Sequence, residues 1–330
     1  MISIAEIFIP WVGSKARLLG YILQIVPPNL NQSLEAFGGS GAFTLALRTD
    51  PKRLDIYNDA DSDLVNLFFC VKELLSPLMK ELGFLPIQSR EAFEIYKAFL
   101  EHQDISMLNI QAELDCIEDR SCFTEEQARE LRPILRGRAK LYDVQRAAAF
   151  VFKIRGSFSS TGDSFGVKPL NIRRFFKGFQ DAEPRLQNVV IEHKNAFQLI
   201  RERNRNGGLI YADPPYVDAE HLYRTSRNNR GRRFHIHLWK LLSACKGYVI
   251  VSYNDCPFIR QLYKDFYILA FQRPNPLSQK KGAKYDEVLI TNYDPRPYIA
   301  QMTLFDMDVH IGEYDMELVN IPKSKRRLLP

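Results

Sequence analysis

A strand that runs into a glycine-rich turn and then into a helix constrains this chain more than any other feature. Residues 33–37 form a strand pattern, three glycines follow directly, and a helical pattern begins near Ala42. A second strand pattern at residues 53–57 leads through a short acidic turn to an amphipathic helix at 63–75. Strand, turn, helix, strand and helix in this order predict a parallel α/β sheet.

This alternation is interrupted between residues 76 and 187. Charged helical patterns occupy 90–102 and 125–152, and a polar, glycine-bearing segment follows at 155–171. Strand and helix patterns then resume at residues 188–192, 208–212, 237–245, 247–255 and 286–293. We therefore expect one α/β domain built from residues 1–75 and 188–330, with a mainly helical domain inserted at 76–187.

Composition and length fit a globular protein. The chain has 330 residues, of which 45% are hydrophobic and 25% charged, and no apolar run approaches the roughly 18–20 residues that span a bilayer. The N-terminus lacks the pattern of a signal peptide. Five scattered cysteines include no close C-x-x-C pair, which favours reduced thiols over a structural metal. We expect a cytoplasmic protein without a membrane partner or a metal site.

Positive charge is concentrated rather than evenly spread. The net charge is +6, and five arginines crowd one short polar stretch: Arg224, Arg227, Arg230, Arg232 and Arg233. A solvated loop explains such a cluster as well as a phosphate-binding surface does. A second basic cluster, at residues 323–327, is typical of a solvated tail.

The glycine-rich turn can hold a nucleotide-like ligand. Glycine permits positive φ and lets a ligand approach the backbone, and the helix behind it offers unpaired N–H groups. The residues of this turn are Phe37, Gly38, Gly39, Ser40 and Gly41. Asp59 follows the second strand about twenty residues later, where an acidic residue suits ribose hydroxyls. Helix capping is the alternative for Asp59, and Asp61 could equally serve as that cap.

The most specific motif is Asp213-Pro-Pro-Tyr216, which directly follows the apolar strand pattern at 208–212. Pro214 and Pro215 fix the chain beyond the strand end and remove two backbone donors. The Asp213 carboxylate and the Pro214 carbonyl can then accept both N–H bonds of an aromatic amine, while Tyr216 offers a flat face for stacking. A preorganised carboxylate also stabilises positive charge that grows on such a nitrogen during alkylation. The alternative is a rigid proline turn with a capping Asp.

Together these motifs resemble the Dam-like DNA adenine methyltransferases. The resemblance rests on Phe8-Ile-Pro-Trp-Val-Gly-Ser-Lys15, on the turn at 35–41, on Asn58-Asp59 and on Asp213-Pro-Pro-Tyr216, in the family's motif order. Arg155-Gly-Ser-Phe158, residues 162–166 and residues 285–292 are also similar to family segments. The resemblance implies a Rossmann-like methyltransferase sheet with an inserted target-recognition domain, and transfer of a methyl group from S-adenosylmethionine to adenine N6 in double-stranded DNA.

The resemblance also implies roles for individual residues. Trp11, Lys15, the turn at 37–41 and Asp59 should bind S-adenosylmethionine, and Asp213 should lie between the cofactor and the target base. The family usually has an acidic residue before a Phe in the third cofactor motif, whereas this chain has Asn195-Ala-Phe197. Asn195 can still hydrogen-bond the cofactor adenine through its amide.

Reaching an amine inside duplex DNA requires flipping of the target base, and Tyr216 is the natural stacking partner for that base. Arg155, Arg173 and Arg174 of the insertion are predicted to contact bases or phosphates, and the Arg224–Arg233 stretch is predicted to clamp phosphates.

Three other interpretations remain open at this point. The same motif could act on RNA adenine, and a catalytically silent relative could bind DNA alone, although an intact Asp213 and glycine turn argue against the second. His235 and His237 could indicate a metal, but they lack nearby cysteine or carboxylate partners and favour an ordinary helix start. A restriction endonuclease partner and the recognition sequence are left undetermined.

Overall fold

The structure is a computed structural model, and the chain divides into two compact units. The structure describes residues 7–84, 90–101, 124–127, 129–130, 143–157, 162, 164–166, 173–217, 231–274, 284–299 and 316–322. The sheet unit consists of Met1–Glu6, Gly13–Ala60 and Asn188–Pro330. The helical unit consists of Ile7–Val12 and Asp61–Gln187, so it includes helix residues before position 76 and a short N-terminal segment.

The sheet unit contains an eight-stranded sheet of the order β3-β2-β1-β4-β5-β7-β6-β8. Its strands are β1 (Gln32–Glu35), β2 (Leu54–Asn58), β3 (Val189–Glu192), β4 (Gly208–Ala212), β5 (Tyr248–Asn254), β6 (Tyr267–Pro274), β7 (Lys284–Thr291) and β8 (Glu317–Asn320). Neighbours from β3 to β5 pair in parallel, whereas β7 is antiparallel to both β5 and β6, and β8 is antiparallel to β6. The predicted Rossmann-like α/β fold is therefore confirmed.

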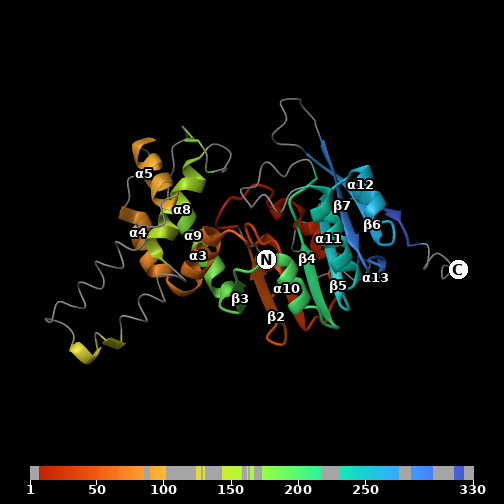
Figure 1. The fold of residues 1–330 in the computed structure, drawn as a ribbon, viewed down its shortest axis with the longest axis horizontal. Helices are drawn as coiled ribbons and strands as arrows, with labels where there is room; N and C mark the ends of the chain where they lie inside the picture. Colours follow the sequence, from red (N-terminus) through yellow and green to blue (C-terminus); the bar gives the residue numbers. More distant parts are fainter. Residues whose placement is uncertain are drawn as a thin grey trace. The chain divides into compact units, whose positions relative to one another are not determined.

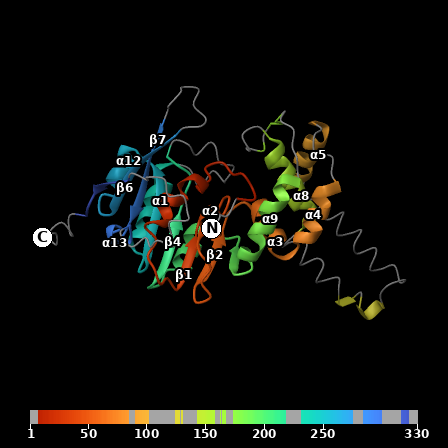
Figure 2. The same ribbon diagram turned by 180° about the vertical axis from the view of Figure 1, so that it is seen from behind.

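Helices cover both faces of this sheet. They are η1 (Ala16–Leu18), α1 (Leu19–Leu23), α2 (Ala42–Ala46), α10 (Ala196–Glu202), α11 (Arg232–Ser243), α12 (Pro257–Leu262) and α13 (Arg296–Ile299). Figure 1 shows α10 and α11 in front of the sheet, where Leu199 and Leu238 join one apolar core. Figure 2 shows α1 and α2 behind it, where Ile22 and Phe43 join a second core. Burial on both faces explains why β4 and β5 are largely apolar runs.

The strand order reverses between β1 and β4. From β1 the chain moves outward to β2 and then β3, and it returns to place β4 on the other side of β1. In open α/β sheets, ligands bind in the crevice at the carboxyl ends of the strands at such a reversal. The glycine turn follows β1 and Asp213 follows β4, so both motifs lie at this point.

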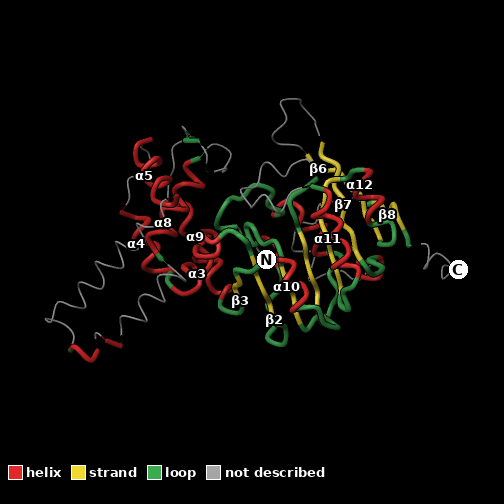
Figure 3. Tube along the Cα trace, in the orientation of Figure 1, coloured by secondary structure: helices red, strands yellow, loops and turns green. Residues whose placement is uncertain are grey.

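The helical unit contains α3 (Ser62–Glu73), α4 (Leu75–Phe84), α5 (Arg90–Glu101), α8 (Val144–Gly156) and α9 (Arg173–Leu186). Figure 3 distinguishes these helices from the strands of the other unit. Phe8 packs against Phe68 of α3 and Phe179 of α9 with ring centroids 4.8 and 5.6 Å apart, which fixes the N-terminal segment to this unit. Among the described helices of the chain, none is long and apolar enough to cross a membrane.

Candidate active site

The glycine turn lies tightly against β2. A Cβ on Gly38 would come within 2.2 Å of the Tyr57 ring and 2.8 Å of the Asn58 carbonyl oxygen. Gly39 and Gly41 have φ of 50° and 66°, in the left-handed region that favours glycine. The Tyr57 hydroxyl donates to the Gly39 carbonyl at 2.8 Å. The turn therefore needs glycine for close approach at one position and for backbone conformation at two others.

Asp59 belongs to the glycine turn and not to the helix that follows it. Its Oδ2 accepts a 2.8 Å hydrogen bond from the backbone N–H of Gly39. Helix α3 is capped by Asp61, whose Oδ1 accepts from the N–H groups of Asp63 and Leu64 at 2.9 and 3.1 Å. The sequence left open whether Asp59 or Asp61 caps this helix. Asp61 is the cap, and Asp59 lies at the carboxyl end of β2.

Asn195 and Phe197 begin the helix after β3. The Asn195 Oδ1 caps α10 by accepting from the N–H groups of Phe197 and Gln198 at 3.0 and 3.3 Å. The half-buried Phe197 ring contacts Phe234 edge-on and stacks on His237, with centroids 5.1 and 4.7 Å apart. Because capping uses the side-chain oxygen, the exposed Asn195 amide can offer a ligand mainly its N–H donors. An acidic residue at this position would offer acceptors.

Asp213, directly after β4, is held through both of its carboxylate oxygens. Its Oδ2 accepts from the Lys15 ammonium at 2.7 Å, and its Oδ1 accepts from the Ser252 hydroxyl at 2.8 Å. The Lys15 ammonium also donates to the Gly13 carbonyl at 2.8 Å. Burial raises the pKa of the Asp213 carboxyl above its ordinary value, while the cation of Lys15 and the bond from Ser252 oppose the rise. The result is a carboxylate that is largely, but not fully, removed from solvent and fixed in one orientation.

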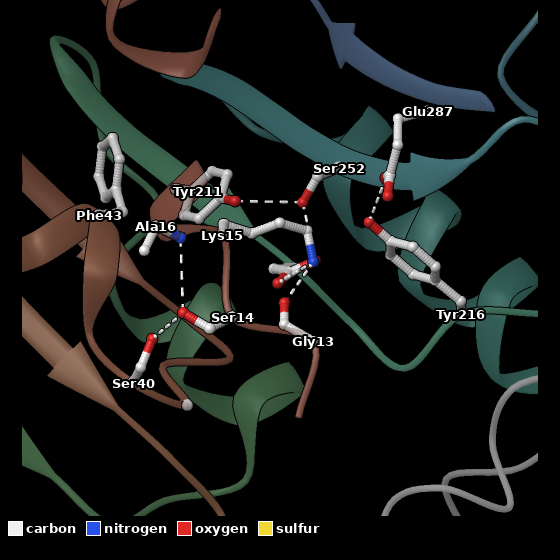
Figure 4. Close-up of polar contacts among 12 residues, drawn as sticks. Gly13, Ser14, Lys15, Ala16, Ser40, Phe43, Tyr211, Tyr216, Ser252 and Glu287 are labelled. Atoms are coloured by element: carbon white, nitrogen blue, oxygen red, sulfur yellow. Dashed lines mark hydrogen bonds and ion pairs between the residues drawn. The ribbon is translucent and has the colours of Figure 1, made fainter. Parts of the chain in front are cut away.

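Tyr216 is fixed through its hydroxyl. The hydroxyl donates to Oε2 of Glu287 at 2.6 Å, and Glu287 on β7 is buried (Figure 4). The Tyr216 ring lies 6.0 Å from that of Tyr253, and the Lys15 ammonium lies 4.7 Å from its centroid. Pro214 and Pro215 between Asp213 and Tyr216 are buried. The motif therefore presents a carboxylate and a positioned aromatic ring side by side.

Sequence reasoning did not identify Ser252 and Glu287 as site residues. Ser252 is a polar residue within the apolar strand Tyr248–Asn254, and Glu287 is a buried carboxylate next to the apolar half of the strand Lys284–Thr291. A buried polar group needs a partner, so a serine or a carboxylate in such a strand is the signal that could have found them.

The candidate residues follow four neighbouring strands. In spatial order, Asn195 follows β3, Asp59 follows β2, the glycine turn follows β1, and Asp213 follows β4. Parallel neighbours lie about 4.8 Å apart, so the four strand ends extend over about 14 Å. Residues separated by up to 176 positions in sequence, from Phe37 to Asp213, thus share one edge of one sheet. An elongated ligand can lie along this edge and end at Asp213.

Two predicted residues lie in the helical unit and are packed there. Trp11 contacts Phe150 with ring centroids 6.0 Å apart. The Arg155 guanidinium donates to the Phe8 carbonyl at 2.6 Å and lies 3.4 Å from the centroid of the Phe175 ring. Burial lowers the pKa of Arg155 to about 10. These contacts assign Arg155 at least a structural role within its unit.

The other predicted DNA contacts are only partly described. Arg232 and Arg233 are exposed and begin α11, five residues earlier than the predicted start of that helix. Arg173 and Arg174 begin α9, but their side chains lie outside the described part of the chain. Arg224, Arg227 and Arg230 lie entirely outside it. His235 is buried and bonds the Tyr253 hydroxyl through Nδ1 at 2.8 Å, and His237 bonds Arg201 through Nε2 at 3.1 Å.

Comparisons with known proteins identify the family of this chain. The chain is 23% identical over 304 residues to the type II methyltransferase M1.LlaDCHI of Lactococcus lactis subsp. cremoris, covering 87% of this chain and 95% of the relative. The solved structure of protein LPL1258 from Legionella pneumophila str. Philadelphia 1 is similar over 96% of this chain and 97% of its own length, with 12% identity and a TM-score of 0.30. The model of the D12 class N6 adenine-specific DNA methyltransferases matches residues 11–274, and the chain therefore belongs to this family.

Proposed function

We propose that this DNA adenine methyltransferase takes the methyl group from S-adenosylmethionine and transfers it to N6 of an adenine flipped out of double-stranded DNA, with Asp213, Pro214 and Tyr216 holding the target. The observation that carries the proposal is the Asp213 carboxylate, which is largely removed from solvent, fixed by two hydrogen bonds and adjacent to the Tyr216 ring at the strand reversal.

The carboxyl edge of the sheet fits S-adenosylmethionine. Asn195 and Phe197 would hold its adenine, Asp59 its ribose hydroxyls, and the turn at 37–41 its amino-acid part. The close approach of Gly38 to Tyr57 supports this assignment, because a turn pressed against β2 leaves its backbone open above the strand ends. When bound, the cofactor supplies an electrophilic methyl group on a sulfonium.

Asp213 and Pro214 would activate the target amine. The lone pair of an aromatic amine is delocalised into the ring, so the nitrogen is a weak nucleophile. Two acceptors that take both N–H bonds favour a more tetrahedral nitrogen, and the Asp213 carboxylate stabilises the positive charge that grows on it. Ser252 holds the second oxygen of that carboxylate and keeps its orientation when the target binds. Much of the rate enhancement would then come from fixed orientation.

Tyr216 would receive the flipped base. Extruding a base costs a few kcal/mol of unstacking, which stacking on an aromatic ring partly offsets. The hydrogen bond to buried Glu287 fixes this ring before the base arrives. Tyr216 therefore supplies a preformed face for the target.

The two units would divide catalysis and recognition. The residues at the sheet edge serve the methyl transfer, so sequence readout is assigned to the helical unit, with Arg173 and Arg174 as contacts to bases or phosphates. Arg155 would support the recognition surface. Arg232 and Arg233, with the arginines that precede them, would bind phosphates of the duplex. The type II relative supports a restriction-modification setting.

Expression in a host that lacks adenine methylation, followed by sequencing of its DNA for modified bases, tests this proposal. We expect N6-methyladenine confined to one short motif in cells with the wild-type chain, and none with an Asp213→Ala variant. Unmodified DNA from cells whose purified wild-type protein binds S-adenosylmethionine would contradict it, and methylation of structured RNA in its place would identify the other substrate.

A further inference from the structure

The Lys15 ammonium bonds the Asp213 carboxylate, one of the two acceptors that the proposed function assigns to the target amine. It donates to Asp213 Oδ2 at 2.7 Å and to the Gly13 carbonyl at 2.8 Å, and it lies over the Tyr216 ring at 4.7 Å from the centroid (Figure 4). The residue is only 5% exposed. An adenine amine bound here would likewise be an N–H donor in contact with the Asp213 carboxylate and the face of Tyr216.

We propose that Lys15 is a placeholder for the target base: its ammonium fills the acceptor site of Asp213 while no base is present, and an entering adenine displaces it. This inference rests on the proposed function. It gives Lys15 a role at the target site, in place of the cofactor site where the sequence resemblance puts it.

Charge explains why Lys15 is needed before the base enters. A buried carboxylate without a partner is costly, and removing one member of a buried ion pair leaves the other uncompensated. Burial already raises the pKa of Asp213, and the Lys15 cation is the first of the influences that oppose this rise. Lys15 therefore favours the ionised form of Asp213 and holds its orientation in the free enzyme.

Charge also explains why Lys15 cannot stay in place during methyl transfer. The target nitrogen becomes positive as the methyl group arrives, and an ammonium at hydrogen-bond distance from the same carboxylate oxygen would repel it. Ser252 retains its own bond to the other oxygen, so Asp213 remains held on one side after Lys15 leaves. The long, flexible lysine side chain permits this movement without a change in the backbone.

The placeholder has a measurable consequence for base insertion. An adenine must compete with the Lys15 ammonium, whereas a DNA duplex with an abasic target position has no base to insert and no competition to overcome. Removing the Lys15 charge should therefore strengthen binding of intact duplex relative to abasic duplex. A residue that merely supports the fold would weaken both complexes equally.

The experiment compares Lys15→Met with wild-type protein on two duplexes that carry the motif found by sequencing, one with the target adenine and one abasic there. Dissociation constants are measured with S-adenosylhomocysteine present, so that no transfer occurs. We expect the ratio of the abasic to the intact dissociation constant to rise about tenfold or more in Lys15→Met. Lys246→Met, which removes an exposed lysine of the same unit, should leave it unchanged.

An unchanged or lower ratio in a folded Lys15→Met protein would overturn the inference, as would weakened binding of S-adenosylmethionine with an unchanged ratio, which would return Lys15 to the cofactor site. If Lys15→Met does not fold, Lys15→Gln, which keeps a polar group without charge, gives the same comparison. Failure of the wild-type chain to methylate DNA would count against the proposed function, whereas methylation by wild type with an unchanged ratio would count against the placeholder alone.

Discussion

The Tyr216 hydroxyl donates a 2.6 Å hydrogen bond to the buried carboxylate of Glu287, which joins the loop after β4 to strand β7. Strand β5 separates these two strands in the sheet. The aromatic ring proposed to receive the target base is thus oriented from a strand that begins 68 residues later in the sequence, and its orientation is set before any ligand binds.

Loss of this bond should slow methyl transfer without changing cofactor affinity. Glu287→Ala frees the Tyr216 hydroxyl, and a small misplacement of a positioning group can cost on the order of 100-fold in rate. Glu287→Gln keeps an acceptor and should recover most of the activity. Single-turnover rates and dissociation constants for S-adenosylmethionine separate the two effects. Tyr216→Phe should match Glu287→Ala, and combining them should add little, whereas fully additive losses would show that the bond does not act as a unit.

The state of Asp213 should set the acid limb of the pH profile. Because the folded-state pKa of Asp213 is raised above its ordinary value of 3.8, the carboxylate gains a proton at higher pH than an exposed Asp would. Activity should therefore be lost as pH falls through a midpoint above that value. Lys15→Met removes an opposing charge and should move the midpoint further upward. A midpoint at or below the ordinary value in kcat/KM would contradict this electrostatic description.

Because Glu35 is buried, the free energy of unfolding of the sheet unit should decrease as the pH rises. Burial raises the Glu35 pKa from 4.5 to about 8, although the N–H groups of Thr44 and Phe43 bond its carboxyl at 2.9 and 3.3 Å. Between these pH values the folded chain holds a proton that the unfolded chain has released, so stability decreases from about pH 4.5 to about pH 8. Glu35→Gln should flatten this part of the profile of Tm against pH. An equal slope in both proteins would show that Glu35 does not titrate in this range.

Gly38 and Gly83 form a matched pair of alanine substitutions. A Cβ at position 38 would meet Tyr57 and the Asn58 carbonyl, and the backbone cannot yield easily, so Gly38→Ala should destabilise by about 1–3 kcal/mol and weaken cofactor binding. A Cβ at position 83 in α4 meets nothing within 4 Å, so Gly83→Ala should be neutral or stabilising by up to about 1 kcal/mol. Chemical denaturation and S-adenosylmethionine titration measure both. Equal effects of the two substitutions would count against the close-approach explanation.

The arginines at the start of α11 should contribute to the salt dependence of DNA binding. Each phosphate contact adds about 0.9 to the slope of log K against log salt, so Arg232→Ala with Arg233→Ala should reduce the slope by up to about 1.8. Arg205 and Lys246 are exposed and precede β4 and β5, at the opposite edge of the sheet. Replacing these two with Ala is the control and should leave the slope unchanged. Equal slopes for all three proteins would exclude phosphate binding by Arg232 and Arg233.

Local signals predicted the central strands well. Strand β4 begins and ends at Gly208 and Ala212 as expected, because an apolar run is bounded there by a glycine and by Asp213-Pro-Pro. Strand β6 (Tyr267–Pro274) was not predicted, although its first five residues are apolar and it pairs with β7, the next strand of the chain, and with β8. The start of α11 was placed too late because Arg232 and Arg233 carry no apolar periodicity, although Gly231, with a φ of 88°, ends the preceding segment.

The residues of the candidate site were likewise predicted only in part. Asp213, Tyr216 and the glycine turn were found because each motif has its chemistry in adjacent residues. Ser252 and Glu287 were not, because their contacts arise only when β5 lies beside β4 and β7 beside β5. The position of the Lys15 ammonium on Asp213, across 198 positions in sequence, also follows from the fold and not from local pattern.

The proposed role of Asp213 is to hold and activate the target adenine amine. The most direct test is the single-turnover rate of methyl transfer to unmodified DNA by Asp213→Ala, with circular dichroism and S-adenosylmethionine binding as checks on the folded site. We predict a loss of at least about 1000-fold while the protein stays folded, since removal of a preorganised group at a developing charge has effects of that order. Near-normal transfer by the folded Asp213→Ala protein would contradict the claim.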